Sequence, residues 1–174
     1  FFYVLIAAML LQISCNLKEG STENYLFHDK IKMVLDKKKK NDRMYELYLK
    51  SNEKTDTLKL PCSDMEKQIE ALFKNGLASS DLDNFKRTNY IKKGYSVTEL
   101  IAKKKSSVVQ QLSFKENGQG VFYYMIKTRK SNRLADVTSE ISFFSNGNFL
   151  ITLNRKVPMS YSNTYRVEGR VLNN

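Results

Sequence analysis

The sequence predicts an α+β fold that is mainly antiparallel β, either an open sheet or a small barrel, with one amphipathic helix near 63–75. Two Asn-Gly pairs, each between alternating apolar runs, predict β-hairpins. A capping sequence followed by apolar residues spaced three and four apart predicts the helix. The length of 174 residues suits one domain with a sizeable core, and 41% hydrophobic residues argue against a disordered chain.

The first element, residues 1–14, is predicted to be a truncated signal peptide. Its sequence FFYVLIAAMLLQIS carries no charge, and the apolar run 1–11 fits the hydrophobic region of a secretory signal. That run is shorter than the roughly 20 apolar residues that span a bilayer. The sequence starts without Met or a basic segment, so we expect that part of the signal is missing. Export is the first functional expectation.

The residues at the end of this segment, Leu11-Gln12-Ile13-Ser14-Cys15, resemble the lipobox of bacterial lipoproteins. Ser14 and Cys15 match its most informative positions, whereas Gln12 replaces the usual aliphatic residue. The resemblance implies that Cys15 becomes N-terminal and lipidated, and several acyl chains make a stable membrane anchor. It also implies a location in the bacterial cell envelope. The polar residues that follow, up to residue 24, then form a tether.

An ordinary signal peptide is the alternative to the lipoprotein interpretation. The mature protein would then be secreted, and Cys15 could pair with Cys62 in an oxidising compartment. Cleavage at or before Cys15 distinguishes the two possibilities.

Residues 25–174 are predicted to form a single domain, and its first part is ambiguous. Tyr45, Leu47 and Leu49 alternate with charged or polar neighbours, and 56–60 resembles a short edge strand. Because short apolar runs do not settle the period, antiparallel strands are the preferred interpretation, with a helix as the alternative.

The helix near 63–75 is predicted from its start, its face and its end. Ser63 and Glu66 form a capping box, and Gly76 follows Asn75 as a left-handed stop. The apolar face consists of Met65, Ile69, Leu72 and Phe73. The polar stretch after it suggests a subdomain boundary near 78–84.

From residue 84 onward the pattern is that of β-structure. The segment 112–118 is echoed at 141–147, and each copy ends in Asn-Gly between alternating apolar runs. Asn and Gly tolerate positive φ, so hairpins are predicted over 107–128 and 137–155. Alternation around Val167 predicts a final strand near 163–172 in the same sheet.

Residues 140–172 faintly resemble the strand rhythm of small bacterial lipocalin-like lipoproteins. The similarity lies in Phe143-x-x-Asn146-Gly147-x-Phe149 and in the later Tyr165-x-Val167-x-Gly169. It implies a barrel that carries a small hydrophobic ligand, which is an alternative function. The Gly-x-Trp signature of lipocalins is absent because the chain has no Trp.

The sequence predicts neither a catalytic site nor a metal or cofactor site. His28 is the only histidine, and a Cys/His pair would need Cys62 beside it. The carboxylate pairs Asp81/Asp83 and Asp136/Glu140 are more typical of solvated charges than of acid–base catalysis. We therefore expect a non-enzymatic protein. An envelope enzyme with an unrecognised site is the remaining alternative.

The charge pattern indicates a polyanion-binding surface. Residues 1–83 hold equal numbers of acidic and basic side chains, whereas 84–174 hold 16 Lys and Arg against 5 Asp and Glu, which accounts for the net charge of +11. Anionic glycan, lipid headgroups or an envelope protein are the expected partners, besides the membrane that holds the anchor; export excludes intracellular nucleic acid. Alternatively, lysine simply decorates a soluble surface. The candidate ligand-binding residues are Lys92, Lys93, Lys103, Lys104, Lys105, Lys127, Arg129, Lys130, Arg133, Arg155 and Lys156.

Overall fold

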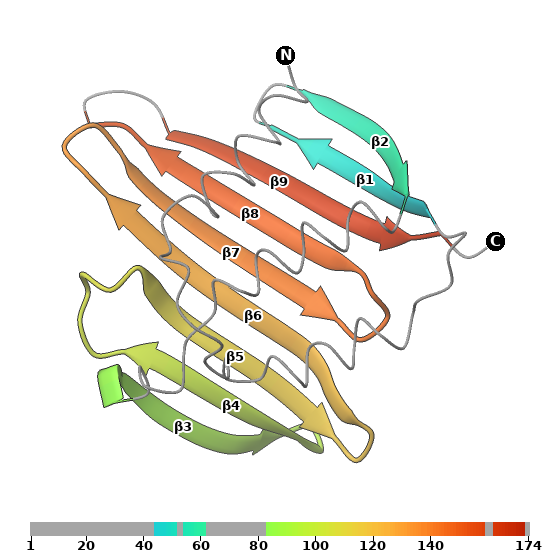
Figure 1. Cartoon of the computed structure of the whole chain (residues 1–174), viewed down its shortest axis with the longest axis vertical. Coiled ribbons are helices and arrows are strands. Elements are labelled where there is room, and N and C mark those ends of the chain that lie inside the picture. Colours follow the sequence, from blue (N-terminus) through green and yellow to red (C-terminus); the bar gives the residue numbers. More distant parts are fainter. Residues whose placement is uncertain (1–43, 52–53, 62–82, 159–161, 173–174) are drawn as a thin grey trace, which may run out of the picture.

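Nine antiparallel strands form one sheet in the computed structural model, which describes residues 44–51, 54–61, 83–158 and 162–172 (Figure 1). Burial alternates along β1 and over much of β9, where one side chain in two is more deeply buried, whereas β5, β6 and β7 each bury three consecutive side chains. The strands are β1 (Met44–Lys50), β2 (Thr55–Pro61), β3 (Phe85–Lys92), β4 (Tyr95–Ala102), β5 (Val109–Asn117), β6 (Gly120–Ser131), β7 (Asp136–Phe144), β8 (Phe149–Lys156) and β9 (Ser162–Val171).

The strand order is β2-β1-β9-β8-β7-β6-β5-β4-β3. Strands β3 to β9 follow one another as a meander, and the β1–β2 hairpin joins it by pairing β1 with β9. The two ends of the described chain therefore meet in the sheet. Within the described strands the sheet is open, with β2 and β3 at its edges, so these strands do not form the small barrel that was an alternative.

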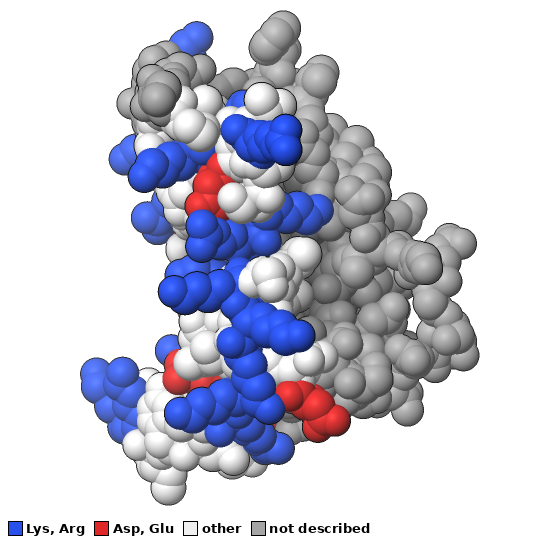
Figure 2. All heavy atoms as spheres, turned by 90° about the vertical axis from the view of Figure 1, so that its left-hand side faces the viewer, with Lys and Arg blue, Asp and Glu red and all other residues white. Residues whose placement is uncertain are grey.

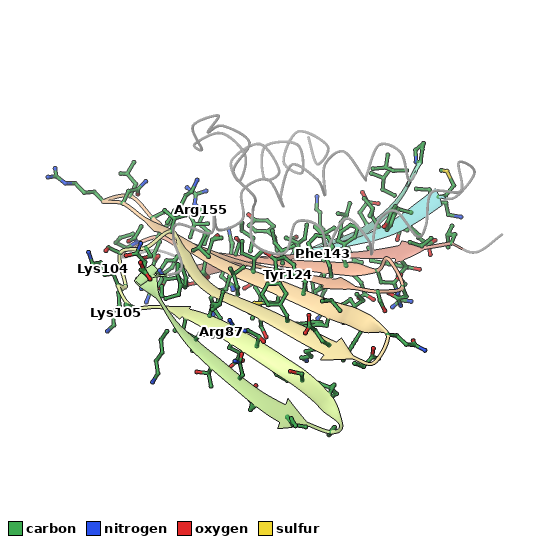
Figure 3. The ribbon with its side chains drawn as sticks, turned by 60° about the horizontal axis from the view of Figure 1, so that its bottom comes forward. Arg87, Lys104, Lys105, Tyr124, Phe143 and Arg155 are labelled. Carbon is green, nitrogen blue, oxygen red and sulfur yellow. The ribbon has the colours of Figure 1, made fainter. Side chains whose placement is uncertain are left out.

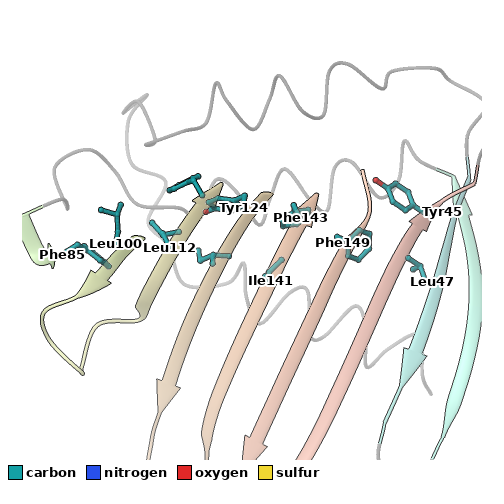
Figure 4. Packing of buried hydrophobic residues seen from close by; sticks show 11 residues of the cluster. Tyr45, Leu47, Phe85, Leu100, Leu112, Tyr124, Ile141, Phe143 and Phe149 are labelled. Atoms are coloured by element: carbon teal, nitrogen blue, oxygen red, sulfur yellow. The ribbon is translucent and has the colours of Figure 1, made fainter. Parts of the chain in front are cut away.

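One face of the sheet carries the hydrophobic core (Figure 4). Cross-strand neighbours continue the same face from strand to strand, as Leu100, Leu112, Ile126 and Ile141 do across β4 to β7. Burial raises the pKa of Tyr124 above its ordinary value of 10, so this phenol stays protonated inside the core.

The ring of Phe149 explains why β9 carries a glycine in its interior. Gly169 is the cross-strand partner of Phe149, and a Cβ atom on it would lie 2.2 Å from the Cε1 atom of that ring. The rings of Tyr45 and Phe143 lie 5.6 and 6.0 Å from the Phe149 ring, centroid to centroid. The Tyr45 hydroxyl donates a hydrogen bond of 2.8 Å to the Gly147 carbonyl. These contacts connect β1 and β9 to the β7–β8 hairpin.

The predicted α+β class is wrong for the part of the chain that the structure describes. That part is one antiparallel sheet of nine strands, and it contains no α-helix. A capping box measures only a local preference, whereas the fold class depends on long-range pairing such as that of β1 with β9. The residues on which the helix near 63–75 was predicted lie outside the described residues, as do Cys15, the tether and Cys62.

Both predicted hairpins and the final strand are confirmed as β5–β6, β7–β8 and β9. The turns differ from the prediction, because the asparagines act through their side chains. Asn117 Oδ1 accepts a hydrogen bond of 2.9 Å from the Gln119 amide, and Asn146 Oδ1 accepts one of 3.0 Å from Asn148. Gly147 has the positive φ expected from its Asn-Gly pair, whereas in the first turn positive φ falls on Gly120 and not on Asn117 or Gly118.

The β3–β4 hairpin was not predicted as a hairpin. Its turn is Lys93-Gly94, with φ values of 51° and 80°, which are the left-handed values that a two-residue hairpin turn needs. Lysine is an uncommon residue at positive φ, so its pair with Gly94 did not stand out in the sequence.

Candidate functional site

The sheet has two ends that differ in their connections. In antiparallel strands, alternate loops lie at the same end. The connections β4–β5, β6–β7 and β8–β9 therefore share one end, and the tight turns at 93–94, 118–119 and 145–148 share the other. We call the first the basic end and the second the turn end.

The basic end gathers most of the predicted polyanion-binding residues. Figure 2, which looks at this end, shows Lys and Arg side chains along it, and Figure 3 shows Lys104, Lys105 and Arg155 at the same end of the ribbon. Strands β4 to β8 span about 20 Å at this end, with neighbouring strands about 4.8 Å apart. The exposed residues that define it are Lys103, Lys104, Lys105, Arg129, Lys130, Arg133, Arg155 and Lys156.

The β4–β5 loop presents Lys104 and Lys105 from a backbone that is held by hydrogen bonds. The Lys103 amide donates to the Asn84 carbonyl at 2.9 Å, and its ammonium group donates to the Asp83 carbonyl at 2.7 Å. The Gln110 side-chain amide donates to the Lys105 carbonyl at 3.2 Å. Lys103 therefore helps to hold the loop, whereas Lys104 and Lys105 extend into solvent.

Arg129 contributes less to a binding surface than the sequence indicated, because its charge is paired. Its Nε and Nη2 atoms donate to the two carboxylate oxygens of Asp136 at 3.0 and 2.6 Å. This two-point hydrogen bond lowers the pKa of Asp136 and raises that of Arg129. The pair fixes the end of the β6–β7 hairpin.

The β6–β7 loop is a tight turn organised by Asn132. Its Oδ1 atom accepts hydrogen bonds from the amides of Leu134 and Ala135 at 2.9 and 2.8 Å. The Asn132 amide in turn donates to the Ala135 carbonyl at 3.0 Å. Arg133 and Leu134 are therefore presented at the tip, while Ala135 is buried beneath them.

Three of the predicted residues lie elsewhere. Lys92 and Lys93 are at the turn end, and Lys127 lies within β6, opposite Gln111 and Glu140. These three candidates are therefore separate from the residues at the basic end, because alternate hairpin connections lie at opposite ends of the sheet. Arg87 was not among the candidate binding residues. The β3–β4 register places it opposite Leu100, beside the basic end, and recognition of Lys93-Gly94 as a hairpin turn could have identified this position.

The charges on β1, β2 and β9 are arranged differently, since both signs alternate on one face. Glu168 accepts from Arg170, with an ion-pair distance of 2.8 Å, and lies 3.8 Å from Arg166. Glu46 accepts a hydrogen bond from the Tyr48 hydroxyl, which raises the pKa of Tyr48. This part of the sheet is close to neutral, so it gives no preference for anions.

The described residues contain no group of three or more His, Cys, Asp or Glu that could hold a metal ion. Nor do they contain a helix long and apolar enough to cross a membrane. Asp136, one half of a predicted carboxylate pair with Glu140, is bonded to Arg129.

Comparison with known proteins gives no match of any kind. No protein-family model matches the chain, and no curated protein or solved structure does so either. The function must therefore be inferred from the residues and their geometry.

Proposed function

We propose that this protein is an exported, lipid-anchored component of the bacterial cell envelope that binds polyanionic ligands at its basic end and catalyses no reaction. The observation that carries the binding proposal is the gathering of exposed cations at one end of the sheet, from the β4–β5 loop (Lys104, Lys105), the β6–β7 loop (Arg133) and the end of strand β8 (Arg155, Lys156). These residues are exposed, so their charges are accessible to a ligand.

A row of exposed cations favours a ligand with repeated negative charges. Single ion pairs at an exposed surface contribute little, and salt screens them over about 10 Å. A polyanion instead contacts several cations at once and loses several condensed counterions, which makes the affinity strongly salt-dependent. The basic end is about 20 Å wide across five strands, which is enough for several such contacts. Anionic glycans and lipid headgroups both meet this requirement.

The anchor is supported by the lipobox-like sequence that ends at Cys15. Lipidation would hold the protein at a bilayer and therefore keep the basic end close to envelope polyanions. Mass spectrometry of the mature N-terminus tests this part, and we expect a triacylated Cys15. A disulfide between Cys15 and Cys62, or cleavage elsewhere, would contradict it.

Binding of the full chain to heparin, a soluble polyanion, tests the basic end. We expect the dissociation constant to rise steeply with added salt. The double variant Lys104→Glu/Lys105→Glu should bind heparin at least about tenfold more weakly, since two attractive charges become repulsive.

The matched control is Lys92→Glu/Lys93→Glu at the turn end. It changes the net charge by the same amount, and both residues are exposed. If the proposal holds, this control binds nearly as well as the unmodified chain. Equal losses in the two double variants would show that only the net charge matters, which would contradict a site at the basic end.

A further inference from the structure

The basic end also carries exposed aliphatic side chains. Leu134 is 77% exposed and Val108 is 50% exposed, and they belong to the β6–β7 and β4–β5 loops. Exposed aliphatic side chains contribute no burial free energy when a soluble polyanion binds to neighbouring cations, because these side chains remain in water. They gain about 25 cal/mol per Å² of surface when they enter an apolar phase.

Both side chains are presented by ordered backbone. The turn around Asn132 places Leu134 at the tip of the β6–β7 loop, next to Arg133. The carbonyl of Val108 accepts a hydrogen bond of 2.8 Å from the Arg129 amide, which ties the β4–β5 loop to β6. A rigid turn loses little conformational entropy on binding, so more of the transfer free energy remains for association.

We propose that the basic end is a docking surface for an anionic lipid bilayer. Leu134 and Val108 enter the boundary between headgroups and acyl chains, while Lys104, Lys105 and Arg133 contact the anionic headgroups around them. The inference rests on the proposed function, because it names the ligand of the same cations. A combination of aliphatic insertion and basic side chains is how peripheral proteins bind anionic membranes.

When the strands stand upright on a flat bilayer, only one end of the sheet meets it. Strand β4 has eight residues, so the basic and turn ends are separated by about 25 Å along it. Ile91, near the turn end, is 82% exposed and lies beside Lys92 and Lys93. It therefore has a similar local composition but should remain in water, which makes it a matched reference position.

The experiment uses tryptophan as a depth reporter, because the chain contains no tryptophan. Leu134→Trp and Ile91→Trp each place one indole in the full chain, at the basic end and near the turn end respectively. Vesicles of phosphatidylcholine mixed with phosphatidylglycerol, with brominated acyl chains, quench an indole only when it reaches the acyl region. The reporter reads one position, so membrane contact by the apolar segment 1–11 does not produce the signal.

We expect quenching of Leu134→Trp to exceed that of Ile91→Trp several-fold on the anionic vesicles, together with a blue shift of its emission. Pure phosphatidylcholine vesicles should give much less quenching at position 134. Adding Lys104→Glu and Lys105→Glu to Leu134→Trp should lower the quenching on anionic vesicles. Equal quenching at the two positions, or none at position 134, would overturn the inference.

Heparin binding by the same tryptophan variants separates this inference from the proposed function. Both substituted residues are exposed, so each variant should keep the fold, and its circular dichroism spectrum checks this. If heparin binds at the basic end and position 134 is not quenched, the bilayer is the wrong ligand and the polyanion proposal stands. If heparin binding is also absent in the unmodified chain, both proposals fail.

Discussion

The two ends of the sheet are built from different kinds of connection. At the turn end the chain reverses in short turns, with positive φ at Lys93, Gly94 and Gly147. The buried side chains of Phe143 and Phe149 flank the turn at 145–148. At the basic end the β4–β5 connection is longer, and exposed cations lie in this loop, in the β6–β7 turn and at the end of β8. Contacts at the turn end therefore join distant strands, whereas the cationic side chains at the basic end are exposed and little constrained by packing.

Contacts from distant parts of the chain support this division. The Tyr45 hydroxyl reaches the Gly147 carbonyl, and the Val171 amide donates to Asn148 Oδ1 at 3.1 Å. Both bonds bring β1 and β9 to the β7–β8 turn. At the basic end, the bonds that involve Asn132, Gln110 and Arg129 stay within one loop or between neighbouring strands.

The largest effect on stability is expected from Gly169→Ala. Its Cβ atom would lie 2.2 Å from the buried Phe149 ring, so the ring or the strand must move, at a cost of about 1–3 kcal/mol in the free energy of unfolding. Urea unfolding measures this change. Gly118→Ala is the control, because no atom lies within 4 Å of its Cβ position and its φ is not positive. Equal losses in the two variants would contradict the role of the Phe149 contact.

A smaller effect is expected from Tyr45→Phe, which keeps the ring and removes the hydroxyl. The hydrogen bond to Gly147 is partly buried, so its loss should lower the free energy of unfolding by about 0.5–1.5 kcal/mol. Denaturant unfolding of both proteins gives the value. An unchanged free energy would show that water replaces the hydroxyl at no cost and that this contact does not stabilise the turn end.

The pair of Arg129 and Asp136 predicts a pH-dependent effect at the basic end. Because the folded protein holds the pKa of Asp136 below its ordinary value of 3.8, this carboxylate stabilises the fold above that pH. The contribution is lost as the pH falls through the lowered pKa. Asp136→Asn should therefore be slightly less stable at neutral pH, and the difference should shrink in acid. A difference that grows on acidification would contradict the ion pair.

The smallest effect on stability is expected from Lys104→Glu/Lys105→Glu. Both residues are exposed, so the free energy of unfolding should change by no more than about 0.5 kcal/mol while heparin binding falls. Thermal unfolding and binding, measured on the same sample, test this separation. A large loss of stability would mean that the lysines hold the loop and that the two ends do not differ as proposed.

Local signals predicted the hairpins well and the fold class poorly. The Asn-Gly pairs at 117–118 and 146–147 mark turns because each asparagine side chain accepts a hydrogen bond from a backbone amide two residues along the chain, and Gly147 adds a positive φ. The same kind of local reasoning missed the hairpin at Lys93-Gly94. Local patterns also left β1 and β2 ambiguous, because short apolar runs do not settle the period and the pairing of β1 with β2 and β9 is not visible in them.

The candidate site was found only in part for a related reason. The clusters Lys103–Lys105 and Arg155-Lys156 are visible in sequence because each is contiguous. Their meeting at one end, the separation of Lys92 and Lys93 from them, and the pairing of Arg129 with Asp136 depend on strand order and register.

The sequence by itself determined the excess of positive charge after residue 84, the alternation that forms strands and the positions of two hairpins, because these follow from composition and from neighbours along the chain. Only the tertiary structure decided that β1 pairs with β9, that Gly169 leaves room for the Phe149 ring, and that Leu134 is exposed near several cations. Those features need residues from distant segments to meet, and contacts of that kind have no signature in any short stretch of sequence.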